Sequence, residues 1–257
     1  MSEHLARAGQ ALPGNLGSWR TDATTRYPRW AIRNPQAGLE DRAAMSGEQR
    51  IEHARLLYER AVFGGDADAL GIAGRELDGV EADLALARGR ILHARFLEDG
   101  NEDPHELALF ERAAQLYQLL DDVRGEAEAL FWVGTFHQVV RRDNDGAVPP
   151  LTRSYELATQ AGDKLTLSYA VRHLGFADMA AGVGSRAREQ LEESVRLRRE
   201  IGFSAGVAAG LLALAYLTAG EGQRDDAMAL VEEAGAVAEA CDAQGVLRWV
   251  EEARTQL

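Results

Sequence analysis

Cysteine, proline and lysine are scarce in this sequence, and no long apolar run occurs. Cys241 is the single cysteine, Lys164 is the single lysine, and the 257 residues include six prolines. These counts exclude disulfide-scaffold, collagen-like and proline-rich proteins. No stretch approaches the roughly 18 to 20 uncharged apolar residues that span a membrane, and the first residues lack the pattern of a secretory signal. We therefore expect a soluble, cytoplasmic protein.

Positive charge is also in deficit, and it is unevenly distributed. The net charge is −13, yet residues 1–45 carry six arginines and four acidic residues, which leaves the remainder strongly acidic. An acidic surface repels phosphate backbones, so nucleic acid is an unlikely main partner. High net charge of one sign also favours solubility.

A short pattern of one large apolar residue, two polar residues and one small residue occurs four times. The small residues that close it, at positions 113, 154, 194 and 234, are 41, 40 and 40 residues apart. A fixed period of this length indicates stacked supersecondary units, each of which buries its apolar face against its neighbour. A second recurring position lies about 20 residues earlier, and it is occupied by His93, Gly134, Gly175 and Ala215.

Within each period the apolar residues recur at helical spacing, and no β-branched alternation is present, so the sequence predicts an all-α protein. We expect two domains: an N-terminal arm over 1–45 and a helical repeat domain over 46–257. The predicted helices of that domain are 47–62, 66–78, 81–98, 103–120, 123–141, 145–161, 164–182, 185–201, 204–221 and 223–241, with a closing helix at 244–256.

The repeat resembles the tetratricopeptide family. Val133-Gly134, Leu174-Gly175 and Leu214-Ala215 match the Leu-Gly pair of that family's first helix, and the spacing from Ala147 to Leu151 to Ser154 matches its second. The resemblance covers 80–257 and, more loosely, 47–79. It implies a right-handed α-solenoid of about five helical hairpins plus a C-terminal capping helix.

Two features depart from the family pattern. The period is near 40 rather than 34 residues, and His137, Asp178 and Thr218 replace an expected aromatic. The longer form is similar to the arrays at the carboxyl end of large bacterial signalling ATPases and regulators. No nucleotide-binding P-loop or helix-turn-helix segment accompanies it here.

The N-terminal arm, residues 1–45, has no periodicity and holds half of the prolines and half of the tryptophans. Its composition favours an irregular or disordered tail. One alternative is a strand-like arm that packs its aromatics in the groove of its own chain or of a neighbour, since its charge complements the acidic body. Another is a nucleic-acid contact through interleaved arginines and aromatics.

The resemblance places the first helix of each hairpin on a concave face, and this nominates residues for a binding groove. The spacings 131/135/138 and 169/172/173/176 put each set on one helical face. For Phe131, Phe176 and Tyr216 the alternative is a place in the core between repeats. The nominated partner-binding residues are Glu128, Phe131, Thr135, Gln138, Tyr169, Arg172, His173, Phe176, Leu212 and Tyr216.

Catalytic and metal signatures are weak. His137 and Asp178 occupy equivalent positions in consecutive repeats and are the only pair that suggests proton transfer. The histidines lack metal-ligand spacing, and Gly182-Val183-Gly184 follows a helix rather than the strand that a dinucleotide fingerprint requires. We expect no cofactor and no metal.

The sequence thus predicts a protein-binding or peptide-binding scaffold, or regulatory module, that uses a concave groove and is not an enzyme. The alternatives are a small-molecule sensor or carrier and an unrecognised enzyme that uses His137 and Asp178. Self-association through the arm or the terminal hairpins is compatible with each.

Overall fold

The computed structural model describes residues 45–257, in which every regular element is a helix. The arm expected at 1–45 therefore lies, apart from Met45, outside the described residues. The helices are α2 (Gly47–Gly64), α3 (Ala69–Asp99), α4 (Glu106–Leu119), α5 (Val123–Thr135), a π-helix η2 (Phe136–Val140), α6 (Asn144–Ala161), α7 (Lys164–Ala180), α8 (Gly184–Glu200), α9 (Ser204–Gly220), α10 (Arg224–Ala240) and α11 (Gln244–Gln256).

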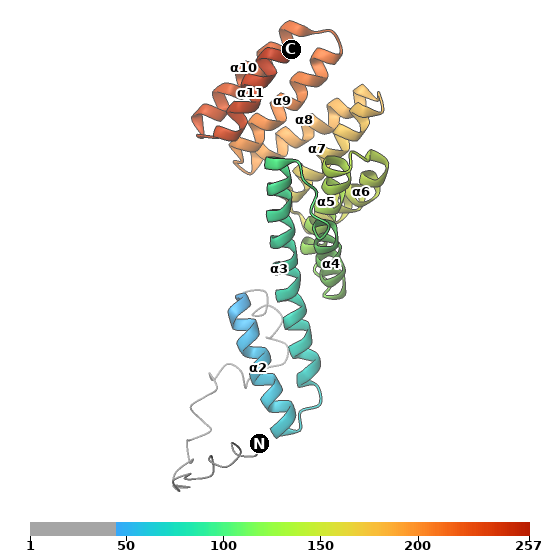
Figure 1. Ribbon diagram of the computed structural model, residues 1–257, viewed down its shortest axis with the longest axis vertical. Helices are drawn as coiled ribbons and strands as arrows, with labels where there is room; N and C mark the ends of the chain where they lie inside the picture. The colour runs from blue at the N-terminus through green and yellow to red at the C-terminus, as the bar shows by residue number, and fades with distance from the viewer. Residues whose placement is uncertain (1–44) are drawn as a thin grey trace, which may run out of the picture. The chain divides into compact units, whose positions relative to one another are not determined.

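Each helix packs on the next one along the chain, as expected of stacked hairpins (Figure 1). In addition α5 packs on α7 and α9 packs on α11, so first helices of successive hairpins also meet. The all-α prediction is confirmed for the described residues, and the packing order is that of a helical repeat. None of the helices within 45–257 has the length and apolar character needed to cross a membrane.

The turns between helices repeat with the sequence period. Gly162, Gly202 and Asp242 adopt left-handed backbone conformations at intervals of 40 residues. After each of them, the next backbone N–H donates to the carbonyl five residues earlier, as in Asp163 to Ala158 and Phe203 to Arg198, both at 2.9 Å. This bond satisfies a carbonyl at the helix end and fixes the direction of the following helix. The turns therefore set the stacking geometry.

Small residues allow the two helices of a hairpin to approach closely. A Cβ atom at Gly134 would lie 2.5 Å from Leu151 Cγ, and one at Gly175 would lie 3.1 Å from Leu191 Cγ. Each glycine therefore makes room for the large residue of the recurring pattern.

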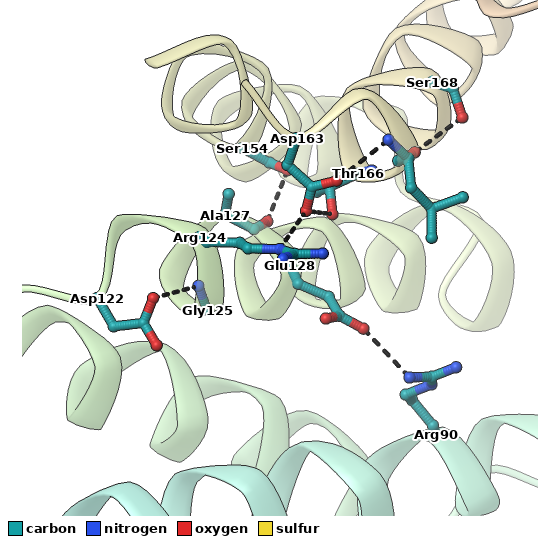
Figure 2. A network of polar contacts seen from close by, with 11 residues as sticks. Arg90, Asp122, Arg124, Gly125, Ala127, Glu128, Ser154, Asp163, Thr166 and Ser168 are labelled. Atoms are coloured by element: carbon teal, nitrogen blue, oxygen red, sulfur yellow. Dashed lines mark hydrogen bonds and ion pairs between the residues drawn. The ribbon is translucent and has the colours of Figure 1, made fainter. Parts of the chain in front are cut away.

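The small residue that closes the pattern has a second role in two of the hairpins. The hydroxyl of Ser154 donates to the Ala127 carbonyl at 2.7 Å (Figure 2), and the hydroxyl of Ser194 donates to the Ser168 carbonyl at 2.7 Å. Both hydroxyls are buried, so each bond satisfies a donor that would otherwise be unpaired.

The π-helix η2 explains why one repeat has 41 residues. The left-handed residues that close successive helices, Asp121 and Arg142, are 21 apart, whereas Gly162 and Gly182 are 20 apart. The extra residue thus falls in the helix that contains η2, where the wider turn accommodates it.

The first hairpin differs from the predicted pattern because 66–78 and 81–98 are not separate helices. Both belong to α3, which continues through Gly79. A single glycine costs a helix only about 1 kcal/mol. Here Gly79 is buried, and a Cβ atom would lie 2.7 Å from Nη1 of Arg50 in α2. Gly79 therefore lies inside a continuous helix, beside the end of the long Arg50 side chain, and does not end that helix.

The contact between α3 and α4 uses a polar pair where the later hairpins use small residues. His93 and Glu106 occupy the positions held elsewhere by Gly134 and Ala147, and His93 Nδ1 lies 2.8 Å from Glu106 Oε1. Glu106 is fully buried, and its other oxygen, Oε2, has no hydrogen-bond partner. Burial raises the pKa of Glu106, and its bond to His93 opposes that shift.

Candidate functional site

The residues nominated on α5, η2 and α7 form a connected aromatic cluster. The ring of Phe131 lies 5.2 Å from that of Tyr169 and 5.3 Å from that of His173, and His173 lies 5.6 Å from Phe176. Phe131 and His173 are buried, whereas Tyr169 and Phe176 are half-buried. The cluster is therefore partly core and partly surface.

Part of this surface borders a cavity of about 280 Å³ between α7, α9 and α11. Four nominated residues line it: Arg172, Phe176, Leu212 and Tyr216. The remaining lining residues were not nominated from the sequence, and these are Met179, Ala209, Ala213, Trp249 and Glu252. Most of the lining is apolar, with one cation and one carboxylate.

The lining residues occupy equivalent positions in three successive first helices. Arg172, Leu212 and Glu252 are separated by 40 residues each, and so are the pairs 176/216 and 209/249. Seven of the nine lining residues thus belong to one stripe of the repeat, and Met179 and Ala213 complete the wall. Adding one repeat of 40 residues to positions 209 and 212 gives 249 and 252, so the period alone could have identified Trp249 and Glu252.

Arg172 is the unsatisfied cation of this cavity. Its guanidinium lies 4.4 Å from the centre of the Phe176 ring, and its Nε is buried without a hydrogen-bond partner. Burial, followed by the charge of Arg198, lowers the pKa of Arg172. No carboxylate of residues 45–257 lies within ion-pair distance of it.

Arg198, on α8, adds a second buried positive charge behind the aromatic cluster. Its side chain is only 1 % exposed and donates to the Gly206 carbonyl at 2.8 Å. The guanidinium stacks 4.9 Å from Tyr169 and 5.9 Å from Phe203. Burial lowers its pKa. Aromatic faces and a backbone carbonyl, rather than an acid, stabilise this charge.

The π-helix connects to the cavity wall through Gln138 and His173. His173 Nδ1 lies 2.7 Å from Gln138 Oε1, and Gln138 Nε2 donates to the His173 carbonyl at 3.0 Å. Burial, followed by the positive charge of Arg172, lowers the pKa of His173 well below its ordinary value. His173 therefore stays neutral and joins η2 to α7 by hydrogen bonds.

The other nominated residues lie away from the cavity. Thr135 is buried and its hydroxyl has no partner, which leaves little of it to meet a ligand. Glu128 is half-buried and pairs with Arg90 of α3 at 3.2 Å (Figure 2). Neither lines a described cavity.

His137 and Asp178, the pair that could have supported proton transfer, share no hydrogen bond or ion pair. The carboxylate of Asp178 binds the guanidinium of Arg186, its neighbour across the α7–α8 turn, with Nε 2.5 Å from Oδ2. His137 lies within η2, where the inserted residue alters the helical register. The pair that suggested proton transfer is therefore not formed.

Within the described part of the chain, no three His, Cys, Asp or Glu side chains gather as metal ligands do.

A second cavity, of about 770 Å³, lies where the α6–α7 and α8–α9 turns meet. Its apolar walls include Tyr169 and Phe203, whose rings are 6.1 Å apart. Its charged rim includes Arg124, which pairs with Asp163 at 3.1 Å (Figure 2). Tyr169 is the one residue nominated from the sequence that lines this second cavity.

Comparison with known proteins adds no relative. No protein-family model matches the chain, and no curated protein is significantly similar to it.

Proposed function

We propose that this chain is a tetratricopeptide-like, right-handed helical scaffold that binds a segment of another protein across its first helices, in the cytoplasm. The observation that carries the proposal is the cavity shared by α7, α9 and α11, whose wall consists mostly of one stripe of the repeat. Repeat proteins use surfaces of this kind, formed by successive units, as binding faces.

The chemistry of the cavity supports a peptide segment. Phe176, Leu212 and Trp249 offer apolar area, and Arg172 and Glu252 offer one group of each charge. Aromatic and arginine residues in partly desolvated pockets supply much of the affinity in protein interfaces. At about 280 Å³ the cavity lies just below the usual range for drug-sized ligands, and it suits one or two side chains of a longer partner.

A peptide-display selection against the full chain tests this proposal. Trp249 is 49 % exposed, so Trp249→Ala should weaken an enriched peptide at least about tenfold while leaving helical circular dichroism intact. Arg172→Gln should weaken it as well. Tyr155→Ala on α6, an aromatic residue outside the cavity that is 39 % exposed, serves as the matched control. Selected peptides that bind both cavity variants undiminished would refute the groove assignment.

The larger cavity supports a second candidate, a small-molecule sensor or carrier. Its volume of about 770 Å³ falls within the usual range for small-molecule sites, and its walls combine aromatic faces with charged groups. A metabolite that binds there should raise the melting temperature with dose. Phe203→Ala should remove that shift, whereas Trp249→Ala should not.

A further inference from the structure

The exposed large apolar side chains of α3 follow a strict seven-residue spacing. Leu70, Leu77, Leu84 and Ile91 are 56 %, 44 %, 48 % and 57 % exposed. Such side chains are common singly, but an aligned row of four over three helical heptads is not.

A second row of smaller residues completes the pattern of a coiled-coil seam. Ala73, Val80, Ala87 and Ala94 each follow a member of the first row by three residues. Alternating steps of three and four residues align both rows along one side of a helix. The seam thus extends from residue 70 to residue 94.

The neighbouring helices leave the later part of this seam uncovered. α4 packs on the opposite side of α3, where Gly89 meets Phe110 and where Ala82 and Leu86 are buried. α2 lies beside the beginning of α3 (Figure 1), where it covers Ala73. Leu84, Ala87, Ile91 and Ala94 remain exposed.

The charges beside the seam change sign along the helix. Glu76, Glu81 and Asp83 flank its first half, whereas Arg88, Arg90 and Arg95 flank its second half. A parallel pair of such helices would place like charges together, whereas an antiparallel pair places acids against arginines. A second copy of this chain in the opposite direction therefore supplies the complementary charges.

We propose that α3 pairs with α3 of a second copy of this chain as an antiparallel two-helix coiled coil. With the two-fold axis between residues 85 and 86, Leu77 and Leu84 each meet an alanine and Ile91 meets Val80 of the second copy, whereas Leu70 lies beyond the paired segment. Leu84 then faces Ala87 of the second copy, and Leu77 faces its Ala94. The same register brings Glu81 near Arg88 of the second copy and Asp83 near its Arg90. This surface is separate from the cavity of the proposed function.

Two of the flanking groups, Glu81 and Arg90, already have exposed contacts within the chain that a partner can share, whereas Glu76 is buried against His53 of α2. Glu81 accepts from Arg112 at 2.7 Å, and Arg90 pairs with Glu128 at 3.2 Å. Arg88 is exposed and has no carboxylate within ion-pair distance among residues 45–257. Its charge is therefore available to Glu81 of the second copy.

Sedimentation equilibrium of the full chain tests the proposal. We expect a concentration-dependent mass that rises from 28.0 kDa toward twice that value. Leu77→Glu combined with Leu84→Glu should restore the monomer mass without loss of helical circular dichroism. Leu119→Glu on α4, at 66 % exposure, is the matched control and should dimerise normally. A chain that is monomeric up to 100 micromolar, roughly, in a solution of low ionic strength would overturn the proposal, as would a dimer that survives both seam substitutions.

A charge exchange tests the orientation and the register. Glu81→Arg alone and Arg88→Glu alone each create two like-charge contacts in the antiparallel dimer and should weaken it roughly tenfold. The double variant restores both contacts and should recover dimerisation to within about twofold. Additive weakening in the double variant would contradict the assigned pairing.

Spin labels at position 75 give an independent measure of direction. In the proposed register the two labels are separated along the axis by roughly 30 Å, because the helix rises about 1.5 Å per residue. Labels side by side would indicate a parallel pair and would overturn the antiparallel arrangement.

Discussion

The α3–α4 hairpin and the α7–α8 hairpin solve the same packing problem in different ways. In α7–α8, Gly175 and Ala187 let the helices approach, and Leu191 fills the space with no exposed surface. In α3–α4, His93 and Glu106 take the corresponding positions as a buried polar pair. The later hairpins expose large apolar residues at scattered positions, such as Tyr155 and Trp249, whereas α3 exposes four of them at a regular seven-residue spacing. This difference suggests that the first region is built to meet another surface.

The largest expected effect is in the regular hairpin. Leu191→Ala removes a fully buried side chain from the contact between α7 and α8 and should lower the free energy of unfolding by about 3 kcal/mol. Urea denaturation followed by circular dichroism measures this. A loss below about 1 kcal/mol would show that Leu191 contributes little to the packing of α7 on α8.

The polar pair between α3 and α4 should give the next largest loss of unfolding free energy when it is broken. Glu106→Ala leaves buried His93 without its partner and opens a cavity, which should cost about 2 kcal/mol in unfolding free energy. Glu106→Gln is the control, since burial already favours the neutral form of this group and the amide has the same shape. If both variants lose equal stability, the bond to His93 is not what stabilises the contact.

Acid should weaken the aromatic cluster through His173. The folded protein keeps His173 neutral, because burial and then Arg172 lower its pKa well below 6.5. The unfolded chain binds a proton below about pH 6.5, so it binds more protons than the folded state and stability falls as the pH decreases. We expect His173 to lower the free energy of unfolding by about 1 kcal/mol between pH 7.5 and pH 5.5. His173→Asn should remove that share of the pH dependence in denaturation curves; an unchanged pH dependence would contradict this.

The smallest effect on folding is expected at the exposed seam. Leu84→Ala should change the unfolding free energy of the monomer by less than about 0.5 kcal/mol, because the side chain is 48 % exposed. Denaturation at a protein concentration too low for dimerisation gives this value. A loss comparable to that of Leu191→Ala would show that the seam belongs to the core of a single chain.

The repeat and its helices were largely predictable because their determinants are local and periodic. The turns at 162, 202 and 242 follow the period read from the sequence. The continuity of α3 was not predictable in the same way, since a glycine such as Gly79 often marks a helix end, and only the structure shows it buried inside one helix. The π-helix was visible as a step of 41 residues, but the sequence did not say where the extra residue lay.

The sequence placed four of the ten nominated residues on one shared stripe of the repeat, but it did not predict the contacts that surround the candidate site. Arg172, Phe176, Leu212 and Tyr216 line the same cavity, as their shared register suggested. The sequence could not show that Asp178 is bound by Arg186, because that contact depends on the turn geometry between α7 and α8. The burial of Arg198 depends on packing by Tyr169 and Phe203, which no local pattern encodes.

Hydrogen–deuterium exchange of the full chain tests the central claim, that the molecule has one self-association face on α3 and a separate binding cavity on α7, α9 and α11. Raising the protein concentration should slow exchange over residues 70–94 and leave 209–216 and 246–252 unchanged. Adding a selected peptide should slow exchange over the latter two segments and leave 70–94 unchanged. Slowing of all three segments by either treatment would contradict the separation of the two faces.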